Sequence, residues 1–118
     1  MESSEWFKLD IAEKDKLVAM NVMGLNYFNS PESIDWYQQH YELGLWHYTS
    51  NIQDANKILQ KLSEENKKVT IHMLSQNVFH CCFYENEGDT KSFISSNSLS
   101  DAICLAAIQY KKKELQKK

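Results

Sequence analysis

Histidine and cysteine are the side chains whose types and spacing come closest to a chemical site in this chain. His72 and His80 fall in two neighbouring segments of β-type alternation, and a short turn between the segments would set them side by side. Cross-strand neighbours have Cβ atoms about 4.5–5.5 Å apart, so two imidazoles could share one zinc ion. Cys82 follows on the same face, and His47 or Asp54 would have to supply a third ligand.

The alternative for His72, His80 and Cys82 is a polar sheet face on which half-buried histidines are satisfied through water. The chain contains no CxxC pair of the kind that builds zinc ribbons. We therefore assign no metal and no cofactor, and we treat these three residues as a polar sheet face.

The three cysteines favour reduced thiols that pack as small apolar side chains, because their number is odd and the chain has enough apolar residues for a core. They are Cys81, Cys82 and Cys104. A nucleophilic Cys82 beside His80 is the competing interpretation, but residues two apart on a strand are separated by about 6.5–7 Å. The G-x-S-x-G elbow of serine hydrolases is also missing. The sequence therefore predicts no catalytic residues and a protein that is not an enzyme.

The charge balance limits the partners that this chain can bind. Its 118 residues include 13 lysines, no arginine and 16 acidic residues, for a net charge of −3. Without a guanidinium fork the chain lacks the usual group for bidentate phosphate or guanine contacts, so we do not expect nucleic acid as a partner. The N-terminus is acidic, and apolar stretches such as Val78–Tyr84 are far too short to cross a bilayer. We expect neither secretion nor membrane association.

Residues 26–49 form the most distinctive segment. They hold seven of the fourteen aromatic residues and three acidic residues, and residues 17–56 contain no lysine or arginine. Neither a helical nor an extended period dominates, so we predict a long connection with a short strand or a turn of helix near residues 34–42. Connections of this length inside a small domain are commonly functional.

Tyrosine and tryptophan anchor protein interfaces because they combine a large apolar area with a polar group. The uncompensated acidic charge of the segment favours a basic protein partner. The contact surface that we predict consists of Trp36, Tyr37, Tyr41, Trp46 and His47. The alternative is that these rings cover the sheet as its outer layer, and both interpretations hold if some rings are buried and others exposed.

Helical and extended patterns place the remaining elements. We predict, in chain order, a helix at 11–23, a helix at 51–65, strands at 69–74, 78–85 and 91–96, and a helix from residue 99 to near the C-terminus. The three helix starts have capping-box spacing, at Asp10 with Glu13, Ser50 with Gln53, and Ser98 with Asp101. In the first helix, Ile11, Val18, Val22 and Leu25 lie along one stripe. This order predicts an α+β domain spanning residues 1–118, with helices packed on a small antiparallel sheet and residues 1–9 as an N-terminal extension.

The register of the central hairpin follows from its alternation. A three-residue turn at 75–77 sets Leu74 opposite Val78, and further along sets Ile71 opposite Cys81 and Val69 opposite Phe83. One face of the hairpin is then wholly apolar. A slip of one residue would scramble both faces, so we favour this pairing.

Three stretches resemble the phage ABA sandwich domain family, a family of small proteins of Bacillus-type phages and prophages. Residues 15–24 read DKLVAMNVMG, residues 48–55 read YTSNIQDA, and residues 99–107 read LSDAICLAA. The resemblance covers roughly residues 13–110 and implies a three-layer α-β-α sandwich of phage or prophage origin. It implies no reaction. Relatives commonly carry arginine after the AIC cysteine, whereas this chain has Leu105, so no anionic contact carries over to that position.

These observations lead to a hypothesis of a non-enzymatic phage or prophage protein that binds a host protein in the bacterial cytoplasm. By analogy, small phage proteins of this kind often inhibit a host factor, including components of host defence. The alternative is a small-ligand module, in which the aromatic residues and the His72/His80 face line a pocket for a nucleotide-like signal. A metal-dependent enzyme is the third and weakest alternative. Pairing at an exposed sheet edge would give a homo-oligomer.

Overall fold

The structure is a computed structural model that describes residues 3–25 and 30–116. Tyr27 and Phe28, two of the aromatic residues counted above, lie outside the described residues. The elements are α1 (Ser3–Trp6), α2 (Ile11–Asn21), α3 (Pro31–Glu42), α4 (Ile52–Glu64), β1 (Lys68–Ser75), β2 (Val78–Tyr84), β3 (Ile94–Ser96) and α5 (Leu99–Gln116). The helices predicted at 11–23, at 51–65 and from residue 99 are present, and the third strand is shorter than predicted.

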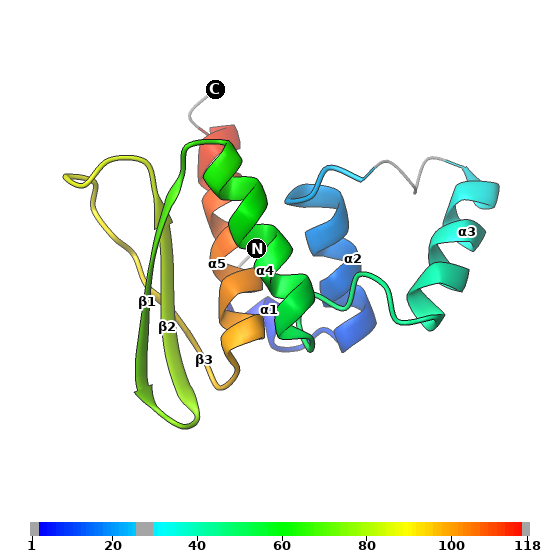
Figure 1. Cartoon of the computed structure of the whole chain (residues 1–118), viewed down its shortest axis with the longest axis horizontal. Helices are drawn as coiled ribbons and strands as arrows, with labels where there is room; N and C mark the ends of the chain where they lie inside the picture. The colour runs from blue at the N-terminus through cyan, green and yellow to red at the C-terminus, as the bar shows by residue number, and fades with distance from the viewer. Residues whose placement is uncertain (1–2, 26–29, 117–118) are drawn as a thin grey trace.

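The strands form one antiparallel sheet in the order β1-β2-β3, which lies along one side of the molecule. Helix α5 is central, because it packs against β2, β3, α4 and α2. Helix α3 lies at the end of the molecule opposite the sheet, beyond α2 (Figure 1). The prediction of an α+β sandwich with helices packed on a small antiparallel sheet is confirmed.

The predicted hairpin register is confirmed along most of its length. Val69 pairs with Phe83 and Ile71 with Cys81. The prediction is wrong at the turn, where Ser75 pairs with Val78 and an irregularity falls between Met73 and Ser75. Leu74 is therefore displaced from the ladder, because a bulge inserts one extra residue into this strand.

Capping residues define where the helices begin. The Asp10 side chain accepts a hydrogen bond from the Glu13 backbone N–H at 2.8 Å, as predicted. The predicted Ser50 cap is wrong, because the Asn51 side chain caps α4 by accepting from the N–H groups of Gln53 and Asp54. Asparagine and serine rank about equally as N-cap residues, so intrinsic preference did not distinguish these two adjacent candidates.

Helix α3 replaces most of the predicted long connection. It runs for 12 residues from Pro31, and the Ser30 side chain caps it by accepting from the Ser33 N–H at 3.2 Å. Proline suits the first helical position, because the missing N–H would have no helical partner there. The aromatic residues of the segment fall on more than one side of α3, which hid its helical period.

The core is built around α5 and includes the N-terminal segment. Trp6 is fully buried, and its indole N–H donates to the Asp101 carboxylate at 3.1 Å. Lys14 forms an ion pair with the same carboxylate at 3.2 Å, and the Ser96 hydroxyl donates to it at 2.7 Å. Asp101 therefore joins α1, α2 and β3 to α5. Ile11 does not join the buried stripe predicted for α2, because it is 55% exposed in the first turn.

Candidate functional site

The predicted contact residues gather on α3 and on the turn that follows it. Trp36 and Tyr37 come from α3, and Trp46 comes from the turn. The rings of Tyr37 and Trp46 stack with centroids 5.0 Å apart and planes 5° apart, and the Trp36 ring lies 5.6 Å from Trp46. The cluster runs from the interior to the surface, since Tyr37 is buried, Trp46 is half-buried and Trp36 is 41% exposed. Tyr37 therefore supports the surface from beneath.

The Trp46 backbone has an unusual conformation for a bulky residue. Its φ of 61° lies in the left-handed region, which costs about 1–3 kcal/mol for a residue with a side chain of this kind. Gly44, two residues earlier, also has a positive φ, of 100°. Packing of the indole against Tyr37 and Trp36 offsets the strain. The turn thus holds a tryptophan at the surface in a fixed orientation.

Tyr41 and His47 form a second stacked pair, with ring centroids 4.1 Å apart and planes 9° apart. The His47 Nε2 atom lies 2.8 Å from the Tyr41 carbonyl oxygen, so this nitrogen carries the hydrogen and donates it. The His47 backbone N–H donates to Asp54, whose carboxylate also pairs with Lys57. One ring nitrogen of His47 and the Asp54 carboxylate are therefore engaged in contacts between α3, its turn and α4.

A buried carboxylate holds α3 and the turn against α2. Asp15 is fully buried and accepts hydrogen bonds from the Tyr41 hydroxyl at 2.5 Å, the Thr49 backbone N–H at 2.9 Å and the Thr49 hydroxyl at 2.8 Å. Burial, together with the hydrogen bond to Asp15, raises the pKa of Tyr41 above its usual range. The Tyr41 hydroxyl is thus a tether inside the molecule, and the residue as a whole is half-buried.

The outward side of α3 and its turn combines apolar and acidic side chains. The exposed apolar residues of α3 and its turn are Trp36, Leu43 and Leu45, together with Ile34 on the side toward α2, and Leu43 is 81% exposed. Three acidic residues of α3 accompany them, namely Glu32, Asp35 and Glu42. No lysine or arginine occurs between residues 17 and 56, and Lys16 of α2 lies on the side of α3 that carries Ile34. We call this set of residues the α3 face.

The predicted His72/His80 pair is present, since the two residues face each other across β1 and β2. The sheet that carries them lies at the end of the molecule opposite α3 (Figure 1). Phe93 covers them, with its ring 5.0 Å from His72 and 6.4 Å from His80. Cys82 is buried, and its thiol lies 3.6 Å from the Phe83 carbonyl oxygen. Within residues 3–25 and 30–116, no three histidine, cysteine or acidic side chains lie close enough together to hold a metal ion.

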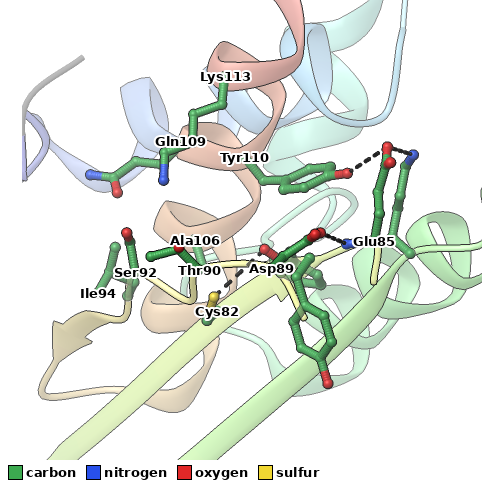
Figure 2. A pocket seen from close by; sticks show the side chains of 13 residues that line it. Cys82, Glu85, Asp89, Thr90, Ser92, Ile94, Ala106, Gln109, Tyr110 and Lys113 are labelled. Carbon is green, nitrogen blue, oxygen red and sulfur yellow. Dashed lines mark hydrogen bonds and ion pairs between the residues drawn. The ribbon is translucent and has the colours of Figure 1, made fainter. Parts of the chain in front are cut away.

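A cavity of about 650 Å³ lies between the end of β2, residues 85–94 and α5 (Figure 2). It opens where the pairing of β2 with β3 ends at Cys81 and Ile94, and the chain between the two strands bends away from the sheet. Figure 2 shows Tyr110 and Lys113 of α5 on one side and Asp89 across from them. Its lining residues are Lys67, Cys82, Phe83, Tyr84, Glu85, Asp89, Thr90, Ser92, Ile94, Ala106, Gln109, Tyr110 and Lys113.

The acidic residues of this cavity are occupied by contacts within the protein. Glu85 accepts from the Lys67 ammonium at 2.6 Å and from the Tyr110 hydroxyl at 3.1 Å. Asp89 accepts from the backbone N–H groups of Glu85 and Asn86 and so closes the turn after β2. Sequence reasoning missed this cavity, because its walls come from segments that lie far apart in the chain. Neither the aromatic cluster of α3 nor the His72/His80 pair lines it.

The cysteines are three buried free thiols. Burial raises the pKa of Cys81 to about 12 and raises that of Cys104 well above its usual value. A thiol that keeps its proton at neutral pH is a poor nucleophile. Cys81 and Cys104 therefore contribute to the core as apolar side chains, as the sequence predicted.

Comparison with known proteins gives one match. A family model described as "Phage ABA sandwich domain" matches residues 16–108, from the middle of α2 to the middle of α5. No curated protein and no solved structure matches the chain. None of the helices in the described part of the chain is long and apolar enough to cross a membrane.

Proposed function

Because the chain belongs to the phage ABA sandwich domain family, we propose that it is a phage or prophage protein that acts by binding a protein of the bacterial host through the α3 face. The observation that carries this proposal is the exposure of Trp36 and Leu43 on a helix at the end of the molecule. Clusters of exposed apolar residues that are rimmed by polar ones mark interaction sites on soluble proteins.

The preorganisation of the α3 face supports binding. Stacking and the backbone of the turn hold Trp46 in place, and the hydroxyl of Tyr41 is tied to Asp15. Side chains that are already ordered lose less conformational entropy on association, so more of the contact energy appears as affinity. Tryptophan is also among the residues most often found at the energetic centre of interfaces.

The charge of the α3 face defines the chemistry of the partner. Glu32, Asp35 and Glu42 accompany the apolar residues, and α3 and its turn carry no lysine, although Lys16 of α2 lines a pocket on the side of α3 that carries Ile34. A complementary protein surface would present an apolar groove bordered by lysine or arginine. A free phosphate or nucleic acid backbone would be repelled by the same charges. The proposed site of action is the host cytoplasm, and inhibition of a host factor, such as a defence component, is the consequence that we propose.

Capture from host lysate with paired variants tests this function. The double variant Trp36→Ala, Leu43→Ser truncates two exposed apolar side chains at the centre of the α3 face and leaves the buried core residues unchanged. Val78→Ser at the hairpin is the matched control, because Val78 is 36% exposed but lies away from α3. We expect mass spectrometry to find a host protein that wild type and Val78→Ser retain and the double variant loses. Retention of the same proteins by all three baits would refute the proposal.

A second measurement tests the stated charge complementarity. Once a captured protein is purified, its affinity for the wild-type chain should fall as salt rises, because salt screens the acidic residues of the α3 face. Glu32→Gln with Asp35→Gln should weaken binding mainly through a slower association rate. An affinity that is independent of salt and of these two substitutions would contradict a basic partner.

The cavity beside β2 favours a second candidate function, the binding of a small ligand. Its volume of about 650 Å³ is within the usual range for sites that hold small molecules. Tyr110 offers a ring on which a base could stack, and Lys113 offers a cation for a phosphate. Thermal unfolding with a panel of nucleotides tests it, since a ligand at 100 times its Kd stabilises by about 2.7 kcal/mol. Tyr110→Ala should abolish any such shift, and a melting temperature unchanged by every nucleotide would remove this candidate.

A further inference from the structure

Strand β1 is an edge of the sheet that carries exposed apolar side chains. The order β1-β2-β3 leaves its outer side without a neighbouring strand among the described residues. On the face that points toward the helices, Val69 is 37% exposed, Ile71 36% and Met73 72%. Their partners on β2, Cys81 and Phe83, are buried. The helices thus cover this face at β2 and leave it largely open at β1.

Natural edge strands are usually protected from pairing by charges, proline, early bulges or short length. Strand β1 has few of these protections. It is eight residues long, and its only charged residue, Lys68, is its first. Its irregularity lies between Met73 and Ser75, at the far end of the strand. Residues 68–73 therefore form a regular and almost uncharged edge.

The sequence of β1 is complementary to itself about Ile71. When two copies pair antiparallel with a two-fold axis at this residue, Ile71 faces Ile71 and Val69 faces Met73 of the second copy, so this face stays wholly apolar. On the other face, Thr70 meets His72. No two like charges oppose each other, because Lys68 lies beyond the Val69–Met73 pair, at the end where the second copy becomes irregular. Such cross-strand pairs are the units that stabilise a sheet.

We propose that β1 pairs with β1 of a second copy in this register and joins the two sheets into one of six strands. A second copy is the occupant that the side-chain pattern supports, because self-pairing sets apolar residues opposite apolar residues on one face and leaves the one formal charge, Lys68, at the end of the ladder with its partner Glu87. The axis runs perpendicular to the sheet, so both helical layers fall on the same side. Val69, Ile71 and Met73 of the two copies then form one continuous apolar stripe.

Figure 1 shows why this dimer is compatible with binding through α3. Strand β1 and α3 lie at opposite ends of the molecule, along the horizontal axis of the view, which is 44 Å long. Pairing at β1 therefore leaves both copies of the α3 face exposed. The dimer does not depend on the proposed function, and each can be tested alone.

Cysteine cross-linking tests the register directly. The native cysteines are all buried, so a cysteine introduced on β1 is the most accessible thiol. Under mild oxidation of the folded protein, we expect Ile71→Cys to form a disulfide-linked dimer, because the two Cβ atoms face each other across the axis. Met73→Cys is the matched control, since it faces Val69 and should cross-link at least about tenfold more slowly. Equal rates for the two variants would overturn the register.

The mass in solution tests the dimer itself. Sedimentation of the wild-type chain should show a concentration-dependent approach to twice the monomer mass of 13.8 kDa. Ile71→Lys places two ammonium groups opposite each other and should raise the dimer Kd at least about tenfold. Met73→Lys, at a more exposed position, would bury an ammonium group within the shared apolar stripe beside Val69 of the second copy, and it should have the same effect if Ile71→Lys fails to fold. Leu43→Lys adds the same charge on the α3 face and should leave the dimer unchanged. A wild-type monomer at every concentration, or a dimer that both β1 variants retain, would overturn the proposal.

Discussion

The Tyr41 hydroxyl should determine how firmly α3 is held to the rest of the molecule. Tyr41→Phe removes one oxygen atom, which donates to the Asp15 carboxylate at 2.5 Å, and leaves the ring stacked on His47. Hydrogen bonds to charged groups contribute about 1.5–3 kcal/mol. Thr49 still supplies two donors to the carboxylate, and water can reach the half-buried ring edge. We therefore expect Tyr41→Phe to lower the stability by about 1.5 kcal/mol, the lower end of this range.

The lost stability should appear first as local opening of α3 rather than as unfolding of the whole chain. The packing that centres on α5 involves β2, β3, α4 and α2, and α3 joins the core through one buried residue, Tyr37. Hydrogen exchange followed by mass spectrometry should show residues 31–42 exchanging roughly tenfold faster, because 1.4 kcal/mol is a factor of ten in an opening equilibrium. Exchange of α5 should change little. The melting temperature should fall by about 5 °C if the helix and the core unfold together.

A matched substitution separates this tether from the general effect of removing a phenol. Tyr110→Phe deletes a hydroxyl that donates to Glu85 at 3.1 Å on the surface. Surface changes of this kind usually stay within about 0.5 kcal/mol. If Tyr41→Phe left the exchange of residues 31–42 as slow as it is in wild type and in Tyr110→Phe, the Asp15 network would not be what fixes the α3 face.

Three further predictions concern the core and the helix ends. Trp6→Phe should lower the free energy of unfolding by at least about 2 kcal/mol in urea titrations, because it leaves the buried Asp101 carboxylate without its indole donor. A decrease below about 0.5 kcal/mol would contradict a core role for the N-terminal segment. Burial raises the pKa of Tyr37 from 10.0 and that of Cys81 from 9.0, each to about 12. The folded state then keeps protons that the unfolded chain releases. The free energy of unfolding should therefore be constant below about pH 9 and fall toward pH 12, by about 1.4 kcal/mol per pH unit for each proton. A urea midpoint that is equal at about pH 8 and about pH 11 would count against this. Asn66→Ala should cost about 1 kcal/mol, because its φ of 65° at the end of α4 is in the left-handed region, whereas Asn66→Gly should be neutral or stabilising in thermal melts.

The elements that sequence reasoning recovered are those whose information is local. The ladder from Val69 to Met73 follows from alternation, which a one-residue slip would destroy. The bulge at Leu74 could not be recovered, because a two-versus-one pairing leaves no periodic signal. The cap of α3 was available in Ser30 and Pro31, but the aromatic residues on several sides of the helix hid its period.

The sequence singled out aromatic residues that the structure brings together, but it did not give their geometry, and their role in binding stays a prediction. The aromatic and acidic composition of the 26–49 segment pointed to Trp36 and Trp46, and the structure brings their rings together. It could not indicate that Tyr41 turns its hydroxyl inward, because its partner Asp15 lies 26 positions earlier in the chain. Nor could it separate Tyr37, which is buried, from Trp36, which is exposed. That distinction depends on tertiary packing.

The two proposed surfaces have different consequences because they lie at opposite ends of the molecule. If β1 forms the dimer, each assembly carries two α3 faces that point apart, and a partner fixed on a surface or in an oligomer can be held at two points. Ile71→Lys should then weaken capture by an immobilised partner while leaving the affinity of a single α3 face in solution unchanged. Trp36→Ala should reduce both measurements and leave the dimer intact. The two variants therefore separate a failure of the binding proposal from a failure of the dimer proposal.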